Sequence, residues 1–383
     1  MGERWRRCGR LARGIARVGV VLLSTAVLLA TGYAWTVYRN LKTDIARTEA
    51  LPAPTVPRSP DEPFTALIVG LDSRTDALGR PLPPELLAQL RAGEDEGQFH
   101  TDTIILLHVP AGPRARAVAV SIPRDSFVQI AYGHGKHKIN SAYGRGLKAA
   151  EETLAAQGVT GADLERRARD AGRRTLLATV QDLVGVRIDH FAEINLAGFV
   201  EITEAIGGVP VCLNAPMRER RSGIDLPAGR QLVTGADALA FVRQRRGLED
   251  GDLDRITRQQ AFLAGVINTA LSSGTLSDPQ RVDRLVGAVE RYVVLDRGWD
   301  LDRLLVQVRR MSGGDVSFRT IPTGTPALDT PVDGIAVAVD PPAVRAFVRS
   351  VVGGYPIGTP EPVSSPGPTA PPPITARGVP CVD

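Results

Sequence analysis

The chain has 383 residues, of which 43% are hydrophobic and 23% charged, values that exclude a wholly disordered chain, a collagen and a multi-span membrane protein. Three cysteines exclude a disulfide scaffold and a cysteine-rich zinc module. The net charge of +4 is carried by the first 20 residues, which hold six arginines and one glutamate, so it is poor support for nucleic-acid binding.

Residues 18–38 form a stretch of 21 residues without a charge, long enough to span a bilayer as a helix. The arginines before this stretch predict that residues 1–17 are a basic cytoplasmic segment. A cleaved signal peptide is the alternative. Tyr33, Trp35 and Tyr38 end the stretch where a cleavage site would need small residues, which favours an uncleaved anchor. In both cases residues 39–383 lie outside the cytoplasm.

Residues 39–63 read as a Pro-rich linker, residues 64–356 as one extracytoplasmic domain, and residues 357–383 as a Pro-rich extended tail. Apolar runs predict strands at residues 64–72, 102–109, 115–122, 190–194, 209–213 and 316–321. Helices are predicted at residues 84–91, 195–206, 235–243, 254–270, 278–292 and 301–311, and at 151–184 as two helices that break at 158–161.

The order of these elements predicts the fold class. Strands alternate with helices, and the strands are continuous apolar runs instead of alternating polar and apolar residues. This pattern is typical of an α/β domain whose central sheet is covered on both faces. Such sheets bind ligands at the carboxyl ends of their strands, where the polar motifs of this chain fall.

Two acids lie at predicted strand ends. Asp72 is the last residue of the predicted strand 64–72, in the motif GLDSR, and Asp102 is the first residue of the predicted strand 102–109. Two carboxylates that converge at strand ends can bind Mg²⁺, which takes one or two carboxylates together with phosphate oxygens. The alternative for each residue is the capping of a turn.

Arginines accompany the acids. Arg124 follows a strand in SIPRD, where Pro123 fixes the turn, and a surface ion pair with Asp125 is the alternative. A second cluster consists of Arg243 and Arg245 and of one face of the following helix, with Arg255, Arg258 and Gln259. Arginine side chains are the preferred partners of phosphate groups, so this cluster indicates phosphate or pyrophosphate binding. A solvated basic face is the alternative.

Other chemistry lacks its signature in the sequence. There is no phosphate-binding GxxxxGK[ST] loop, no GxGxxG and no GxSxG. His134 and His137 lack an evident third ligand for zinc, and their loop, which continues through residues 138–140, is expected to form part of a ligand rim. Cys212 and Cys381 both lie outside the cytoplasm, where they either form a disulfide that ties down the tail or remain unpaired thiols.

In chain order, these motifs resemble the LytR-CpsA-Psr family of bacterial envelope proteins, and the arginine-rich style and the ending GVPCVD resemble its actinobacterial members. The resemblance rests on LIVGLDSR, TDTIILLHV, SIPRD, KINSAYGRG, DHFAEINLAGFVEITEAIGGVPV and LPAGRQLVTGADALAFVRQRRGLEDGDLDRITRQQ. It implies a three-layer α-β-α domain with a mixed central sheet, preceded in the chain by one N-terminal transmembrane helix. It also implies a Mg²⁺-dependent phosphotransferase that moves a glycopolymer from a polyprenyl-pyrophosphate carrier onto peptidoglycan.

The resemblance also implies roles for individual residues. Asp72 and Asp102 would face Mg²⁺, Arg74 would orient the phosphate end, and Arg124 would contact the pyrophosphate with Asp125 beside it. The same subsite would be completed by Arg243, Arg245, Arg255 and Gln259, with Arg258 as a further candidate. Catalytic roles fall on Asp72, Asp102, Arg124, Asp125 and Arg245, with Asp102 and Asp125 as candidates for the general base. His100 stands where the family usually has arginine or another polar residue.

The expected protein is therefore a single-pass enzyme of the cell membrane with its catalytic domain outside, with glycan donor, peptidoglycan and membrane as partners and no nucleic acid. A non-catalytic protein that holds polyprenyl-pyrophosphate lipids is the first alternative, and a pyrophosphatase acting on such lipids is the second. A transcription attenuator would need a cytoplasmic nucleic-acid module, and the segment before residue 18 is too short to fold into one.

Overall fold

The computed structural model describes residues 17, 19–29, 31–33, 35–36, 39, 43–52, 62–90, 99–112, 116–219, 223–244, 252–270, 272–299, 316–352, 374–375 and 378–383. The chain divides into two compact units, Met1–Asp44 and Ile45–Asp383. The predicted helix 301–311, the basic segment up to residue 16 and most of the tail 357–383 lie outside the described residues.

The first unit is helical at its described positions between residues 17 and 39. Its apolar side chains, among them Val20, Leu22 and Leu29, are exposed. Within the described positions, we find no helix of the length and apolar character that a bilayer crossing requires. Positions 18, 30, 34, 37 and 38 of the predicted span are outside the described residues.

The second unit is built on an eight-stranded mixed sheet with the order β1-β12-β7-β2-β3-β4-β13-β16. Neighbours run parallel in β1/β12, β2/β7 and β4/β13, and antiparallel in β12/β7, β2/β3, β3/β4 and β13/β16. The strands are β1 (Ala46–Thr48), β2 (Phe64–Asp72), β3 (His100–Val109), β4 (Ala117–Ser121), β7 (His190–Asn195), β12 (Val293–Asp296), β13 (Val316–Thr320) and β16 (Ile374–Thr375).

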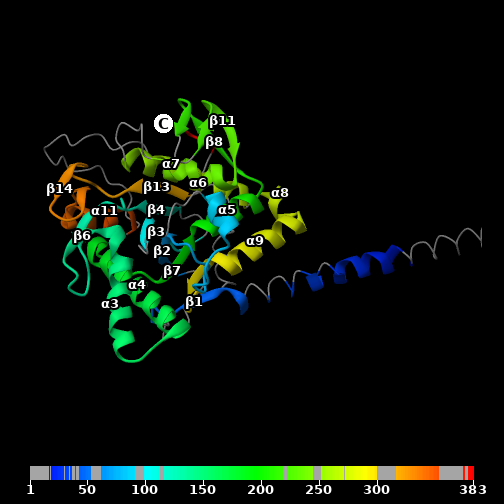
Figure 1. Ribbon diagram of the computed structural model, residues 1–383. Coiled ribbons are helices and arrows are strands. Elements are labelled where there is room, and N and C mark those ends of the chain that lie inside the picture. Colours follow the sequence, from blue (N-terminus) through cyan, green and yellow to red (C-terminus); the bar gives the residue numbers. More distant parts are fainter. Residues whose placement is uncertain are drawn as a thin grey trace, which may run out of the picture. The chain divides into compact units, whose positions relative to one another are not determined.

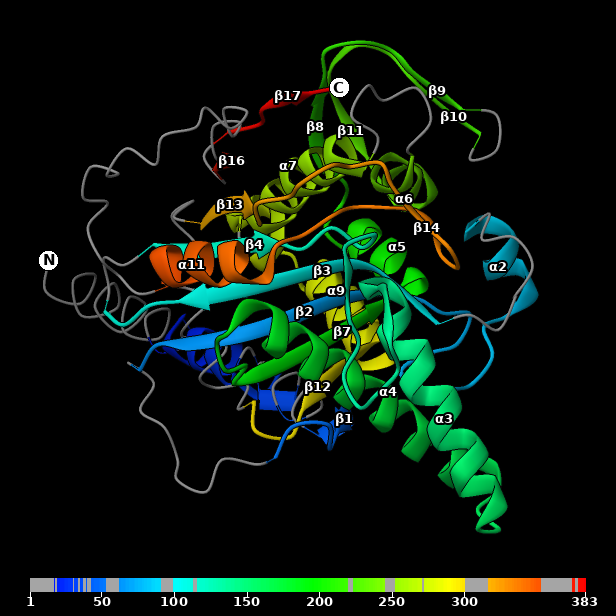
Figure 2. The same cartoon turned by 90° about the vertical axis from the view of Figure 1, so that its left-hand side faces the viewer.

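Helices cover both faces of this sheet, as predicted (Figures 1 and 2). One face carries α3 (Ala142–Ala156), α4 (Gly161–Val184) and α11 (Pro341–Val352). Leu67 of β2 and Leu106 of β3 pack there with Leu176 and Val344 of these helices in one buried core. The other face carries α5 (Leu196–Ala205), α6 (Gly235–Arg243), α7 (Asp252–Ala270) and α9 (Pro279–Tyr292). The core strands are buried on both faces, which explains why they read as continuous apolar runs.

Smaller elements surround the main sheet. A three-stranded sheet has the order β11-β8-β17, formed by β8 (Val209–Leu213), β11 (Gly229–Val233) and β17 (Cys381–Val382). The remaining elements are α2 (Pro84–Leu90), β5 (Phe127–Gln129), β6 (Lys136–Lys138), η1 (Ile139–Ser141), β9 (Met217–Glu219), β10 (Ile224–Leu226), α8 (Ser273–Leu276), β14 (Leu328–Thr330) and β15 (Gly334–Ala336).

The predicted linker and tail boundaries are wrong, because segments from both join the folded domain. β1, at Ala46–Thr48, lies inside the predicted linker and pairs in parallel with β12 at the edge of the sheet. Thr48 is fully buried, and its hydroxyl donates to Asp170 of α4 over 2.5 Å. In the tail, β16 extends the main sheet and β17 pairs with β8.

A disulfide joins Cys212 of β8 to Cys381 of β17, across a sequence separation of 169 residues. The two cysteines are also directly paired in the strand register. The structure therefore contains the first of the two arrangements that the sequence left open. This bridge fixes the described end of the tail to the domain.

Helix α3 begins at Ala142, well before the start predicted at residue 151. Gly144 and Gly146 lie inside this helix at points of close approach. A Cβ on Gly144 would lie 3.2 Å from the Phe99 carbonyl oxygen, and one on Gly146 would lie 2.2 Å from the Thr175 hydroxyl oxygen of α4. These glycines are therefore required by tight packing.

His108 of β3 couples the stability of the domain to pH. Its side chain is 7% exposed, and its Nδ1 lies 3.1 Å from the Thr65 hydroxyl oxygen. Burial lowers the pKa of His108 below the ordinary 6.5, and the opposing charge of Asp189 is the smaller effect. The unfolded chain thus binds this proton at a higher pH than the folded chain, so stability falls as pH drops below 6.5.

We expect the free energy of unfolding to fall between about pH 7.5 and about pH 5.5, with a His108 contribution of at most about 1.4 kcal/mol per pH unit. Urea unfolding of the wild type and of His108→Gln at both pH values measures this contribution as the difference in slope. Equal slopes for the two proteins would contradict the assignment.

Candidate active site

Three chain segments meet at one edge of the main sheet. Because β3 runs antiparallel to both β2 and β4, the start of β3 lies beside the ends of the other two strands. The ladder between β2 and β3 is irregular here: Gly70 pairs with Thr103 but Leu71 pairs with Thr101, so Asp102 is an extra residue without a register partner. Such a bulge re-aims a side chain, and here it belongs to one of the predicted acids.

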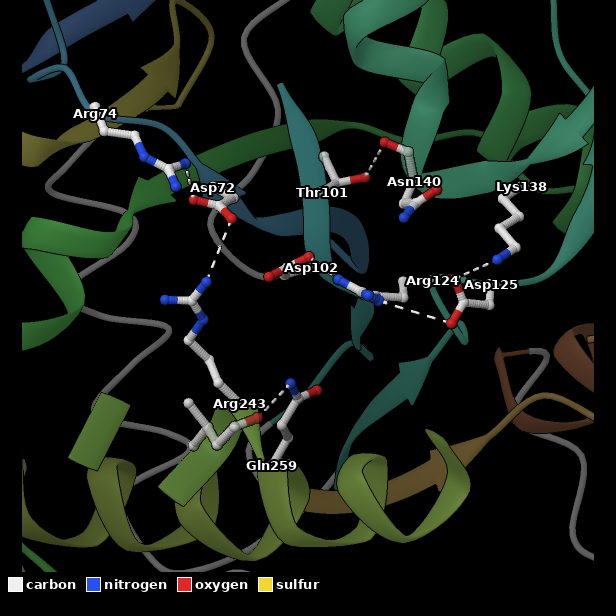
Figure 3. A network of polar contacts seen from close by, with 11 residues as sticks. Asp72, Arg74, Thr101, Asp102, Arg124, Asp125, Lys138, Asn140, Arg243 and Gln259 are labelled. Atoms are coloured by element: carbon white, nitrogen blue, oxygen red, sulfur yellow. Dashed lines mark hydrogen bonds and ion pairs between the residues drawn. The ribbon is translucent and has the colours of Figure 1, made fainter. Parts of the chain in front are cut away.

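Asp72 leaves the end of β2 and contacts two arginines (Figure 3). Its Oδ1 accepts from Arg74 Nη1 at 2.5 Å, and its Oδ2 lies 3.4 Å from Arg243 Nη2 at the end of α6. Burial raises the pKa of Asp72, and the negative charge of Asp102 adds to this shift, while Arg243 and Arg74 oppose it. The two predicted acids are therefore close enough to repel each other.

Arg124 links the second acid to the loop after β4. Its Nη1 donates to Asp102 Oδ1, and its Nε lies 3.8 Å from Asp125 Oδ2. Lys138 Nζ approaches the other oxygen of Asp125 at 3.5 Å. Figure 3 shows Arg124 between the two acids, with Lys138 beyond Asp125. All four side chains are between 13% and 19% exposed, so they are held by protein contacts but remain accessible.

Lys138 was named in the sequence only as part of a rim loop, and the structure places it in the cluster. Main-chain bonds hold its segment beside Arg124: Asn140 N donates to the Arg124 carbonyl at 3.1 Å, and Ile139 N to the Ser126 carbonyl at 2.9 Å. The motif KIN, which follows the glycine-rich turn, is the signal that could have identified this cation.

The helices α6 and α7 supply the far side of the cluster (Figure 3). Arg243 ends α6 and points at Asp72. Gln259 of α7 donates its amide to the carbonyl of Val242 at 3.1 Å, so it fixes the turn that presents Arg243. Arg245 lies outside the described residues, and Arg255 is buried at 2% exposed.

Arg258 is not part of this cluster, which corrects its candidacy for the pyrophosphate subsite. Its side chain is buried, and its Nε donates to the Asp383 carbonyl at 2.8 Å. Its Nη1 donates to Gln244 Oε1 at 3.2 Å, and its guanidinium stacks over the Phe241 ring at 5.5 Å. Arg258 therefore joins α7 to the end of α6 and to the strand β17. With both Arg255 and Arg258 buried, the alternative of a solvated basic face is wrong for this helix.

His100 lies directly opposite Asp72 in the ladder between β2 and β3. It is partly buried, and its charge when protonated lowers the pKa of Asp72. The position that departs from the family pattern is thus a neighbour of the first acid.

The donor set at this edge fits a hard cation. Among the described residues, no group of three or more His, Cys, Asp and Glu side chains could hold a metal ion. Asp72 and Asp102 alone supply two carboxylates, which suits an ion that completes its shell from phosphate oxygens and water, as Mg²⁺ does. A cation would also relieve the repulsion from Asp102, which adds to the larger effect of burial in raising the pKa of Asp72.

The arrangement can therefore bind a doubly charged phosphate group. Within the described residues, Arg74 and Arg243 contact Asp72, Arg124 contacts Asp102, and Lys138 contacts the neighbouring Asp125. Arg forks and lysine are the usual phosphate partners, and each of these cations is also held by a carboxylate that fixes its position. This preorganisation is what charge stabilisation in phosphoryl transfer requires.

Comparisons with known proteins find relatives of this chain. The LytR_cpsA_psr family model matches residues 33–342. The cell wall biosynthesis protein LcpA of Corynebacterium glutamicum is 46% identical over 294 residues, which is 75% of this chain and 55% of LcpA. The polyisoprenyl-teichoic acid–peptidoglycan teichoic acid transferase TagU of Bacillus mycoides is 31% identical over 221 residues, 57% of this chain and 56% of TagU. The chain thus spans just over half the length of each of these two relatives.

The fold also matches solved structures. The LytR-Csp2A-Psr enzyme from Actinomyces oris aligns with a TM-score of 0.51 at 20% identity, and the alignment covers 81% of this chain and 94% of the other. At this level of identity the likeness supports the three-layer fold with its mixed sheet.

Proposed function

The chain belongs to the LytR-CpsA-Psr family, in its actinobacterial type, and from this premise we propose that it transfers a glycopolymer from a polyprenyl-pyrophosphate carrier onto peptidoglycan. The observation that carries the proposal is the cluster at the sheet edge, where Arg74, Arg124, Lys138 and Arg243 contact the carboxylates of Asp72, Asp102 and Asp125. The relatives LcpA, a cell wall biosynthesis protein, and TagU, a teichoic acid transferase, support the same reaction class.

In the proposed reaction, a hydroxyl of peptidoglycan attacks the glycan-proximal phosphorus of the carrier and gives up its proton to the general base, for which Asp102 and Asp125 are the candidates. The new phosphoester bond forms as the bond to the bridging oxygen breaks, and polyprenyl phosphate leaves with the electron pair of that bond. Arg124 and Arg243 approach the cluster from opposite sides, so they can hold the two phosphates and neutralise charge that develops on them. Arg245, two residues after Arg243 in the sequence, is proposed to join them.

Asp72 and Asp102 are the proposed ligands of Mg²⁺, and Asp125 holds Arg124 in place. When bound, Mg²⁺ would supply further neutralisation of the pyrophosphate charge. Gln259 orients the segment that carries Arg243. Positioning and charge neutralisation are the main sources of rate in phosphoryl transfer, so this set of residues suits the task.

The sheet offers an apolar surface for the carrier. Ile68 of β2 and Leu107 of β3 remain partly exposed, and they lie on the sheet face opposite to Leu67 and Leu106. Two partly exposed apolar side chains on the same face of neighbouring strands favour contact with a hydrocarbon chain. We assign this face to the polyprenyl group.

A membrane anchor at residues 18–38 is part of the proposal and rests on the uncharged run and the arginines before it. Membrane fractions washed with alkaline carbonate should retain the full chain, and protease added outside the cell should digest residues 39–383. Release of the intact chain by carbonate would contradict the anchor.

The reaction is tested with the full chain in detergent, a radiolabelled polyprenyl-pyrophosphate oligosaccharide and peptidoglycan fragments, with Mg²⁺ and with a chelator. We expect label to move onto peptidoglycan only with Mg²⁺. Tight binding of the lipid without transfer would indicate a lipid-holding protein instead, and release of phosphate products without an acceptor would indicate a pyrophosphatase.

A further inference from the structure

The two acids at the site lie where the regular ladder between β2 and β3 ends or is interrupted. Asp72 is the last residue of β2 and is followed by the loop that contains Ser73 and Thr75. Asp102 is the extra residue of a bulge two positions after the start of β3. Asp102 thus has no partner in the ladder and Asp72 is the last residue that has one, so contacts beyond the ladder help to set the separation of the two carboxylates.

Arg169 of α4 contacts both segments. Its Nη2 donates to the Thr75 hydroxyl at 2.9 Å, three residues after Asp72. Its guanidinium lies over the ring of Phe99 at 5.0 Å, immediately before β3 begins. The side chain is buried at 4% exposed, so both contacts are shielded from water.

Each contact ends at a point that is itself held firmly. The Thr75 hydroxyl also bonds Ser73 at 2.7 Å, and the Thr75 carbonyl accepts from the Asn195 amide at 2.5 Å. The Phe99 main chain lies so close to α3 that a Cβ on Gly144 would approach its carbonyl oxygen to 3.2 Å. Arg169 thus bridges two supported segments, and a shift at either end would be transmitted to the other.

Glu165 fixes the guanidinium in this position. Its Oε1 accepts from Arg169 Nη2 at 2.9 Å and from Nε at 3.2 Å, one helical turn away. The loop after β2 packs against the same carboxylate, because a Cβ on Gly79 would lie 2.5 Å from Glu165 Oε1. Glu165 therefore holds the guanidinium of Arg169 in a fixed position between the two segments, unlike a mobile surface cation.

From these contacts we infer that Arg169 is a positioning residue of the active site, which ties the Asp72 loop to the start of β3 and thereby sets the spacing of the two acids. It lies outside the phosphate-binding cluster and acts through Thr75 and Phe99. The inference rests on the proposed transfer reaction for its kinetic consequence, but its structural consequence can be measured without any substrate.

The test compares four variants of the full chain. Arg169→Met keeps most of the apolar part of the side chain and removes the guanidinium with its contacts to Thr75, Glu165 and Phe99. Thr75→Val removes the hydroxyl. Thr75→Ser restores the hydroxyl, so it should rescue what Thr75→Val loses. Arg166→Met is the matched control, since Arg166 lies on the same helix but is 58% exposed and pairs with the exposed Asp163.

Provided that the variants keep the wild-type fold, Arg169→Met and Thr75→Val should lower kcat of transfer at least about tenfold, because a small misplacement of the reacting groups lowers the rate by this factor or more. Thr75→Ser and Arg166→Met should stay within about twofold of the wild type. Amide hydrogen exchange at residues 73–76 should accelerate at least about tenfold in Arg169→Met, with exchange in the core strands unchanged.

Unchanged exchange at residues 73–76 in Arg169→Met would overturn the inference, and so would an equal loss of kcat in Thr75→Ser and Thr75→Val. If Arg169→Met loses its fold, the Thr75 pair decides by the same two measurements. A wild type that transfers no glycan would refute the proposed function, while the exchange measurement would still decide the role of Arg169.

Discussion

Replacing Asp72 by asparagine is expected to lower the rate of glycan transfer at least about 100-fold without loss of the fold, in line with the loss of one preorganised charge contact in other active sites. Asparagine has the shape of aspartate but no charge, so it cannot hold a divalent cation or fix Arg74 and Arg243 as strongly. Single-turnover transfer of labelled glycan at saturating donor and Mg²⁺ measures the chemical step directly.

The fold should tolerate this change, because burial already disfavours the charged form of Asp72 and raises its pKa. Asp225→Asn is the matched control: Asp225 lies on β10, is 68% exposed and pairs with an exposed arginine. Its transfer rate should equal that of the wild type. A rate for Asp72→Asn within about tenfold of the control would remove Asp72 from the proposed catalytic set.

Replacing Cys381 by serine is expected to lower the free energy of unfolding by roughly 2–5 kcal/mol. The bridge to Cys212 closes a separation of 169 residues, and the loss of chain entropy in the unfolded state grows with the length of the closed loop. β17 has only two residues, so few ladder bonds remain to hold it when the bridge is gone. Urea unfolding of the oxidised full chain measures the difference.

The double variant Cys212→Ser/Cys381→Ser provides the control for this prediction. If the two cysteines act only through their bond, the free energies of unfolding of the double and the single variant should agree within about 0.5 kcal/mol. The same reasoning predicts that a reductant destabilises the wild type and leaves both variants unaffected. A loss below about 1 kcal/mol in Cys381→Ser would show that strand pairing and the Arg258 contact to Asp383 suffice to hold the tail.

Strand prediction succeeded where the sequence itself determines burial. The strand at Phe64–Asp72 was predicted with its observed bounds, because an apolar run that ends in a turn motif is a local property. β1 and β12 were missed: each has three or four residues and is stabilised by pairing with the other, which is distant in sequence. Short strands of this kind carry too little pattern to be recognised without their partner.

Most of the candidate site followed from motifs, and its errors have a common cause. Asp72, Arg74, Asp102, Arg124 and Arg243 were named from residue type and position, and the structure brings them together. Arg258 satisfies the same helical spacing as Gln259, but its guanidinium bonds the Asp383 carbonyl. Helical periodicity predicts on which face of the helix a side chain lies, but it does not predict which distant segments pack against that face.

The sequence alone determined the alternation of strands and helices, the apolar character of the core and the side chains available for phosphate chemistry, because these depend on composition and local order. Only the tertiary structure decided that β3 lies antiparallel between β2 and β4. This arrangement brings Asp102, near the start of β3, close to Asp72 at the end of β2 and to Arg124 after the end of β4. It also decided the bulge at Asp102 and the buried bridge through Arg169. The physical reason is that strand order and long-range contacts arise from the packing of the whole domain, which no local pattern encodes.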